Sequence, residues 1–485
     1  MSLKKELING VFWTAIQKYS GLIIQLVVSA VLARLISPAD FGVVAIASVI
    51  ILFLNLFTDM GIGPAIIQKK HLSKDDLNQI YSATIYIGVL FASILFGSSY
   101  FIASFYEKDL LIPICQILSI NLLFSALNIV PNALILKAKR FKFIAQRTLI
   151  LQVLTGILSV FAALKGLGVY SLLISPLITA IGVFFINFRQ YPLTFHCRFK
   201  ATPLKEIASY STFQFLFNFL NYFSRNLDSL IIGKHIGLSA LGYYEKSYKL
   251  MMLPLQTVTN VITPVMHPIL SVLQNSLSEL AHRYNKIVKL LATISFPLGI
   301  LFHFTGGEII NIVYGNNWDK AIPIFNILAL SLPFQMILSS TGSIYQAAGK
   351  TNWLFYNGLS NTFFTASGFI ISALFFDSLE AFAWAWNISL TINVFISYWI
   401  LYKKVLLTSI IPMLKELYIP FLNIIIVTPI LLIMETKMQY ETNIYASFAI
   451  KVALTLVVSY LCIQLGGQYN INKIIKELKG KSFPN

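Results

Sequence analysis

Long apolar runs are the feature of this sequence that most limits its possible folds. Runs of about twenty residues, nearly free of charge, follow one another along almost the whole chain. Each run can cross the hydrocarbon core of a bilayer as one α-helix, and a helix satisfies its own backbone polar groups there. We therefore predict an all-α polytopic membrane protein with about 14 transmembrane helices.

The composition leaves little room for any soluble domain. Of the 485 residues, 57% are hydrophobic and 11% are charged, and the mean hydropathy is +0.75. Such values exclude an ordinary soluble protein. We expect the spans at 10–35, 41–66, 80–104, 111–136, 146–165, 168–188, 208–233, 241–268, 286–305, 321–346, 353–375, 380–401, 412–434 and 444–465.

Basic residues gather in alternate loops between these spans. The net charge of +17 would suggest a nucleic-acid partner in a soluble protein, but here its distribution follows the positive-inside rule. That rule predicts that the basic loops and both termini are cytoplasmic, which requires an even number of spans. We expect no nucleic-acid partner. The basic segments include 69–74, 137–147, 189–205, 283–289, 403–415 and the tail at 473–481.

No metal, cofactor or catalytic chemistry is expected. The three cysteines are far apart in sequence, and the six histidines form no HxxxH or HExxH pattern. A membrane-bound polymerase or ligase would need a large outer loop with polar catalytic groups, whereas the longest outer connections, 306–321 and 435–443, are short. We predict a transporter without catalytic residues, metal or cofactor.

An internal repeat predicts two related halves. Residues 33–45 align with 233–245 at an offset of 200, which matches Gly42 to Gly242, and 112–118 align with 322–328 at an offset of 210. We predict two pseudo-symmetric six-helix lobes, 1–200 and 201–405, followed by two extra helices and a basic tail in 406–485. Lobes with an even number of spans share one orientation, and a cavity between them is the expected binding site. Because one chain holds both lobes, we expect a functional monomer.

Charged residues interrupt the apolar pattern in the segment 222–254. Ionisable groups at membrane depth cost about 2.5–3.5 kcal/mol or more and usually face a bundle interior or a water-filled cavity. Basic groups outnumber acidic ones, which suits an anionic head group such as a phosphate. The predicted substrate-binding residues are Arg225, Lys246, Lys249 and Lys18.

Acidic residues at similar depth are candidates for binding a coupling proton or cation. They are Asp228, Glu245 and Asp59. Structural alternatives remain open: Arg225 and Asp228 are spaced to pair on one helix face, Glu245 and Lys249 could snorkel to the head groups, as could Lys18, and Asp59 could cap a helix break. On the cytoplasmic side, a basic rim of Lys137, Lys139 and Arg140 would gather anionic lipid, or serve only as the orientation signal.

Three stretches carry a family resemblance: KKELINGVFWTAIQKYSGLIIQLVVSAVLARLISPADFGVVAIASVIILF, LFTDMGIGPAIIQKK and SRNLDSLIIGKHIGLSALGYYEKSYKLMMLP. They closely resemble bacterial polysaccharide-transport flippases of the O-antigen and exopolysaccharide (Wzx, WzxC-like) type. The resemblance covers nearly the whole chain. It implies membership of the multidrug/oligosaccharidyl-lipid/polysaccharide exporter superfamily.

The resemblance also implies a function. Such a protein would move undecaprenyl-diphosphate-linked oligosaccharide across the bacterial inner membrane by alternating access, with cation antiport as the usual proposed drive. Its implied partners are the lipid-linked oligosaccharide, membrane lipid, and the polysaccharide polymerase and chain-length machinery. The alternatives are a multidrug exporter of the same superfamily, against which the basic surplus argues, and a lipid II flippase.

Overall fold

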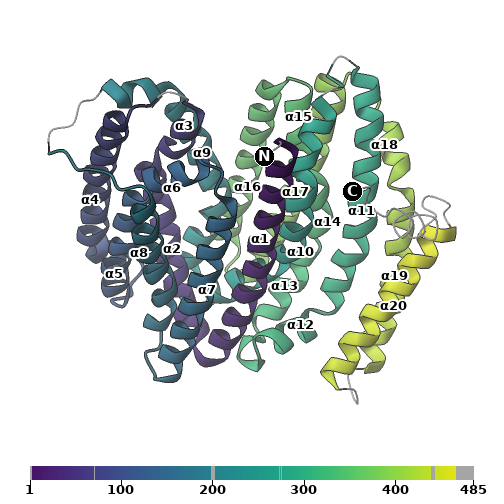
Figure 1. Ribbon diagram of the computed structural model, residues 1–485. Coiled ribbons are helices and arrows are strands. Elements are labelled where there is room, and N and C mark those ends of the chain that lie inside the picture. Colours follow the sequence, from purple (N-terminus) through teal and green to yellow (C-terminus); the bar gives the residue numbers. More distant parts are fainter. Residues whose placement is uncertain are drawn as a thin grey trace. The chain divides into compact units, whose positions relative to one another are not determined.

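A computed structural model describes residues 3–69, 72–197, 202–271, 273–274, 276–438 and 443–465. These residues form helices and no strand, as the sequence predicts. The chain divides into two compact units, Met1–Glu245 and Lys246–Asn485 (Figure 1). The boundary between the predicted lobes, at 200/201, stays a prediction, and the basic tail at 473–481 lies outside the described residues.

The helices of the N-terminal unit are α1 (Leu3–Leu35), α2 (Pro38–Asp59), α3 (Ile62–Gln68), α4 (Lys74–Phe105), α5 (Leu111–Leu127), α6 (Ile129–Lys137), α7 (Phe141–Leu164), α8 (Tyr170–Gln190), α9 (Thr202–His235) and the start of α10 (Leu238–Ser271). The C-terminal unit contains the rest of α10, then α11 (Leu277–Phe304), α12 (Gly306–Val313), η1 (Asn316–Trp318), α13 (Ala321–Ala329), α14 (Leu332–Leu338), α15 (Thr341–Ala347), α16 (Thr351–Phe375), α17 (Leu379–Ile400), η2 (Leu401–Val405), α18 (Ile411–Glu416), α19 (Tyr418–Met438) and α20 (Ile444–Leu465).

The described helices agree with a multi-pass membrane protein. By length and composition, 10 of them could cross a membrane, or up to 12 if each bent pair counts as one span. The bent pairs are α5 with α6 (41°), and α13 with the segment Leu332–Ala347 (46°). The predicted spans 208–233 and 241–268 fall on α9 and α10, which are not among those 12 in the described part of the chain. The predicted total of about 14 therefore stays a prediction.

Local sequence explains where several helices begin and end. Ser37 caps α2 by accepting a hydrogen bond from the Asp40 amide, and Pro38 occupies the first turn, where its missing N–H costs nothing. The helix stops at Met60 and Gly61, which both take left-handed backbone angles. Ser73 and Asp76 form a reciprocal capping box at the start of α4.

The sharpest packing constraint in the N-terminal unit is the crossing of α2 and α10 at two glycines. A Cβ atom on Gly42 would lie 1.7 Å from the Leu238 carbonyl oxygen, and a Cβ atom on Gly242 would lie 2.0 Å from the Pro38 carbonyl oxygen. The contacts are reciprocal, because Pro38 and Leu238, like Gly42 and Gly242, are 200 residues apart. Each of the two glycines thus packs against the segment that the sequence repeat aligns with its own.

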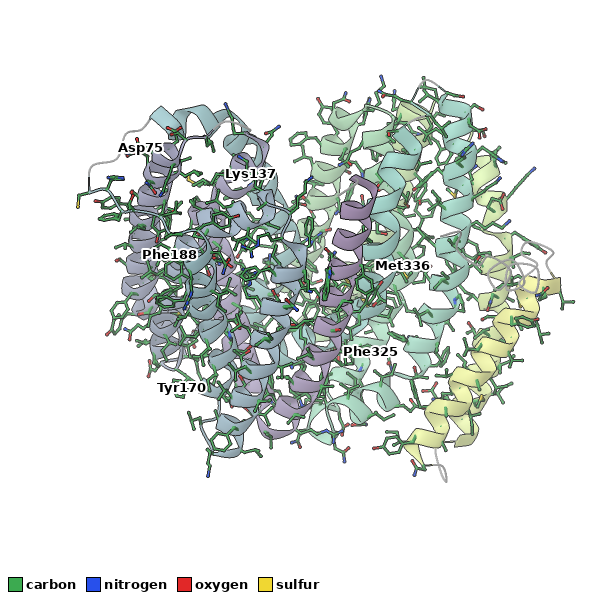
Figure 2. The ribbon with its side chains drawn as sticks, viewed as in Figure 1. Asp75, Lys137, Tyr170, Phe188, Phe325 and Met336 are labelled. Carbon is green, nitrogen blue, oxygen red and sulfur yellow. The ribbon has the colours of Figure 1, made fainter. Side chains whose placement is uncertain are left out.

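The basic rim residues lie toward one end of this unit. Asp75 at the start of α4 and Lys137 at the end of α6 are drawn toward one end of the unit, and Tyr170 at the start of α8 lies at the opposite end (Figure 2). Lys69, Lys137, Lys139 and Arg140 belong to the first of these ends, where Lys137 donates a hydrogen bond to the Lys69 carbonyl.

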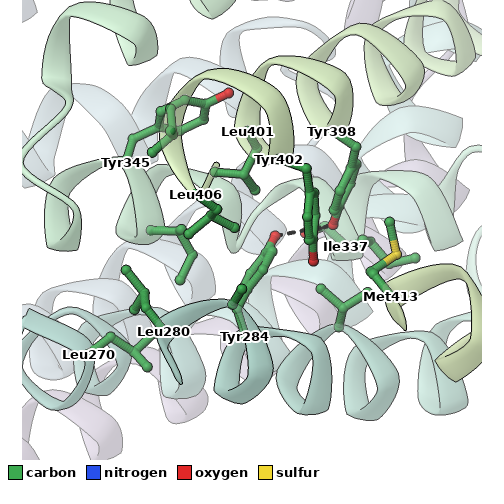
Figure 3. Close-up of a cluster of buried hydrophobic side chains, with 14 of the residues drawn as sticks. Leu270, Leu280, Tyr284, Ile337, Tyr345, Tyr398, Leu401, Tyr402, Leu406 and Met413 are labelled. Atoms are coloured by element: carbon green, nitrogen blue, oxygen red, sulfur yellow. Dashed lines mark hydrogen bonds between the residues drawn. The ribbon is translucent and has the colours of Figure 1, made fainter. Parts of the chain in front are cut away.

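Buried tyrosines hold the core of the C-terminal unit together. Tyr284 of α11 shares hydrogen bonds of 3.2 Å with the hydroxyls of Tyr398 and Ser340. Tyr402, in the π-helical turn η2, donates to Asn285. Figure 3 shows these rings converging among Leu401, Leu406 and Met413. A buried hydroxyl needs a hydrogen-bond partner, so this network determines how α11 packs against α17.

A buried ion pair attaches α20 to the same unit. Lys451 lies 2.5 Å from Glu308 of α12 and donates to the Phe304 carbonyl at 2.8 Å, while Ser447 donates to Glu308 at 2.8 Å. Both charged side chains are nearly inaccessible. The first of the two extra helices, α19, packs against α11 and α20. A buried pair of this kind specifies one docked position for the end of the chain.

Candidate functional site

Two acidic side chains of the predicted site lie on either side of one serine hydroxyl. Ser229 donates through Oγ to Glu245 at 2.8 Å, and the same hydroxyl lies 3.5 Å from Asp228. Asp228 also accepts from the Tyr244 hydroxyl at 2.9 Å and from the Ser229 amide at 2.7 Å. The turn between α9 and α10 folds the helices back together, which brings residues 228 and 245 into one cluster.

This carboxylate cluster is suited to holding a proton or a cation. Asp228 is only 5% exposed, and Tyr244 is fully buried. Two carboxylates linked through one hydroxyl repel each other when both are ionised, and the low dielectric of a buried site strengthens that repulsion. A bound proton or cation would remove it.

The predicted pairing of Arg225 with Asp228 is not formed. Asp228 points its oxygens at Tyr244 and Ser229, whereas Arg225 is exposed and makes no ion pair with it. The spacing of three residues permits two side chains to meet on a helix, but here the tyrosine from the next helix takes the position. Arg225 therefore lies exposed on the N-terminal unit.

Lys246 is enclosed by aromatic rings. It is 6% exposed, and its Nζ lies 5.0 Å from the ring centroid of Tyr314 and 5.9 Å from that of Trp318. Both distances fit cation–π attraction, which compensates a desolvated ammonium. To contact a substrate phosphate, Lys246 would have to leave these rings.

The other predicted basic residues are exposed in their own units. Lys18 on α1 belongs to the N-terminal unit with Arg225, and Lys249 on α10 belongs to the C-terminal unit. Exposed cations on membrane helices need a polar environment, either at a head-group layer or in a water-filled cavity.

Asp59 lies at the break between α2 and α3. Its carboxylate accepts hydrogen bonds from the backbone amides of Gly61 and Gly63. These contacts satisfy backbone amides at the start of α3. They agree with the alternative that Asp59 caps a helix break. A role in ion coupling stays a prediction for this residue.

The basic rim lies around the short connection between α6 and α7. Arg140 donates to Gln190 at 2.7 Å and covers the Phe143 ring at 4.9 Å. Lys139 takes a positive φ of 54° in the same turn. Arg147, at the end of the basic segment 137–147, is buried and does not belong to the rim.

Sequence reasoning missed the environment of Arg147. This residue lies in α7, where its Nη1 donates to Asn187 of α8, and Asn187 in turn donates to Asn128 at 2.8 Å. The sequence signal for this environment was the presence of uncharged amide side chains within the predicted spans. A search for charges alone passes over such residues.

The exposed ion pair between Lys234 and Glu107 lies outside the predicted spans and is expected to respond to pH. Lys234 at the end of α9 donates to Glu107 at 2.9 Å, and this hydrogen bond, with the lysine charge, lowers the pKa of Glu107. A lowered folded-state pKa stabilises the fold above the ordinary carboxyl pKa, and the gain is lost as the pH falls through the folded value. We expect Lys234→Gln to raise the pKa of Glu107 toward its ordinary value, as followed by ¹³C-carboxyl NMR of labelled protein. An unchanged titration would mean that the pair does not persist in solution.

The described helices define an all-α polytopic membrane protein. The chain has the fold of the lipid II flippase MurJ in its inward closed conformation, with a TM-score of 0.75 at 15% identity over 94% of this chain and 98% of the other. Residues 31–323 match the family described as polysaccharide biosynthesis protein, and the chain belongs to that family. The family match agrees with the polysaccharide family that the sequence resembles.

Two relatives illustrate the family. The chain is 26% identical to the teichuronic acid biosynthesis protein TuaB of Bacillus subtilis (strain 168), over 82% of this chain and 83% of the relative. It is 23% identical to the lipopolysaccharide biosynthesis protein WzxC of Escherichia coli (strain K12), over 87% of this chain and 86% of the relative.

Proposed function

We propose that the protein is a flippase that translocates undecaprenyl-diphosphate-linked oligosaccharide across the bacterial inner membrane by alternating access. The observation that carries the proposal is the MurJ-like fold over 94% of a chain that belongs to a polysaccharide biosynthesis family. The substrate is an O-antigen or exopolysaccharide repeat unit. Both termini are cytoplasmic, and the protein acts as a monomer beside the polymerase and chain-length machinery.

Basic residues compensate the diphosphate in this proposal. Arg225, Lys249 and Lys18 are exposed in their units, and an arginine can hold a phosphate through paired hydrogen bonds. Lys246 contributes charge from behind the rings of Tyr314 and Trp318. The rim residues Lys137, Lys139 and Arg140 attract the anionic head group at the cytoplasmic face.

The Asp228–Ser229–Glu245 cluster couples transport to a proton or sodium ion. Its carboxylates exchange the ion, and Tyr244 and Ser229 carry the change in hydrogen bonding between α9 and α10. Asp59 remains a second candidate.

Complementation of cells that lack their own polysaccharide flippase tests the function. We expect the wild type to restore surface glycan, and Arg225→Ala to lower transport about 10- to 100-fold, the loss expected for a charge-assisted hydrogen bond of about 1.5–3 kcal/mol. Asp228→Asn is expected to remove the dependence on an ion gradient in proteoliposomes. Arg283→Ala is the matched control, because Arg283 is exposed and pairs with Glu279 of its own helix, α11.

Each outcome has a stated meaning. Full transport by Arg225→Ala at normal expression would rule out the diphosphate role of this arginine. A wild type that fails with every glycan tested but expels cationic dyes would favour the multidrug exporter. A wild type that moves lipid II alone would favour the lipid II flippase.

A further inference from the structure

A partly open cavity of about 670 Å³, with a lining of polar and apolar residues, lies in the N-terminal unit between α1, α2, α5, α7 and α8. Amides line it from Gln25, Asn121, Asn128 and Gln152, together with serine and threonine hydroxyls. No lining residue in the described part of the chain is charged. All of these helices belong to the N-terminal unit.

The cavity lies where two membrane helices are irregular. Asn128 occupies the 41° bend between α5 and α6, and Pro176 interrupts the hydrogen bonding of α8. Both residues line the cavity. Irregular backbone at membrane depth is tolerated where it is buried in protein or lines a cavity, and discontinuous helices are a common way to build a binding site near the midplane.

Hydrogen bonds between the lining amides and other protein groups determine which amide atoms remain to bind a ligand. Asn128 accepts through Oδ1 from Asn187, which leaves its NH₂ group as a donor. Asn121 donates through Nδ2 to the Pro176 carbonyl at 2.8 Å, which leaves its Oδ1 as an acceptor. Gln152 also lines the cavity, but its Oε1 is buried against α1, 3.0 Å from the position that a Cβ on Gly21 would take. The cavity thus presents donors and acceptors together.

This arrangement matches the hydroxyl groups of a sugar. A hydroxyl both donates and accepts, so it can satisfy neighbouring groups of each kind. An ionic ligand is disfavoured, because no lining residue in the described part of the chain supplies a counter-charge. The volume is within the range of small-molecule sites and accommodates a mono- or disaccharide.

We propose that this cavity binds uncharged sugar residues of the lipid-linked oligosaccharide and determines which glycan the protein accepts. The inference rests on the proposed function and assigns to it a specificity site separate from the basic residues that hold the diphosphate. Arg147 is a positioning residue in this scheme. It fixes Asn187, and Asn187 orients the Asn128 amide toward the cavity.

Binding is tested with the full chain in lipid nanodiscs. The probe is the repeat-unit oligosaccharide freed of lipid and diphosphate, titrated by ligand-observed NMR, with inorganic pyrophosphate as a second probe. We expect Gln152→Leu to weaken oligosaccharide binding about tenfold or more, since a lost hydrogen bond leaves a polar group unpaired. The near-isosteric Thr179→Val removes a hydroxyl group from the part of the cavity lined by α8. Pyrophosphate binding should be unchanged in both.

Gln116→Leu is the matched control, because Gln116 is also an amide of a membrane helix, α5, but does not line the cavity. Equal oligosaccharide affinity in the wild type, Gln152→Leu and Thr179→Val would overturn the inference, as would a wild type that transports the glycan without binding the free sugar. Failure of the wild type to complement would instead count against the proposed function. The two failures are therefore distinguishable.

Discussion

Gly42→Ala is expected to destabilise the protein by about 1–3 kcal/mol or more, the range found when extra atoms are forced into a packed core. The new Cβ would lie 1.7 Å from the Leu238 carbonyl oxygen. That atom belongs to the backbone, so no rotamer change can relieve the clash, and α2 must move away from α10. We expect Gly242→Ala to behave alike, since its Cβ would meet the Pro38 carbonyl oxygen at 2.0 Å.

Thermal unfolding in detergent, followed by the exposure of buried cysteine, measures the effect. Gly97→Ala is the control: Gly97 also lies in a membrane helix, but apart from its own helix backbone no atom lies within 4 Å of the position that a Cβ would take there. It should be neutral or slightly stabilising, because alanine favours helix more than glycine does. Wild-type stability of both crossing variants would contradict the close contact.

The second large effect is expected at the buried ion pair of α20. Lys451→Ala should cost about 3–5 kcal/mol, because it leaves Glu308 buried without its cation. Lys451→Met combined with Glu308→Gln should recover most of this loss, since neither residue then carries a charge. The measurement is the same unfolding experiment, arranged as a double-mutant cycle.

An exposed pair in the same unit provides the comparison. Arg283 and Glu279 are 53% and 43% exposed, and removing one partner of such a pair should cost at most about 0.5 kcal/mol. A Lys451→Ala variant no less stable than Arg283→Ala would show that α20 is held by apolar packing alone.

The sequence predicted the helical class and most span positions, because runs of apolar residues at membrane length are hard to satisfy in any other way. The break after Asp59 and the match of Gly42 to Gly242 also came from local pattern. Both have a direct backbone cause, since glycine is favoured where a helix ends in a left-handed conformation and is needed where two backbones touch.

The details of the site were less predictable. Spacing shows which side chains can share a helix face, but Tyr244 from the following helix decided the partner of Asp228. Lys246 was predicted from its charge, whereas its rings come from residues 314 and 318. The amide-lined cavity was missed because uncharged polar residues give no signal in a search for charges, and their meaning depends on which helices meet.

The crossing of α2 and α10 also bears on how this chain can change over generations. Each glycine touches the other copy of its own segment, which is the contact pattern that a two-fold axis produces in a dimer of identical chains. In an ancestor with one such segment per chain, a single substitution would have altered both sides of the contact at once. In the present chain the same change requires two independent substitutions, and each one alone meets an unchanged partner backbone. We infer that substitutions accumulate more slowly at these two positions than in the rest of the repeat. The two glycines therefore still mark the alignment of the two segments after most other matching residues have diverged.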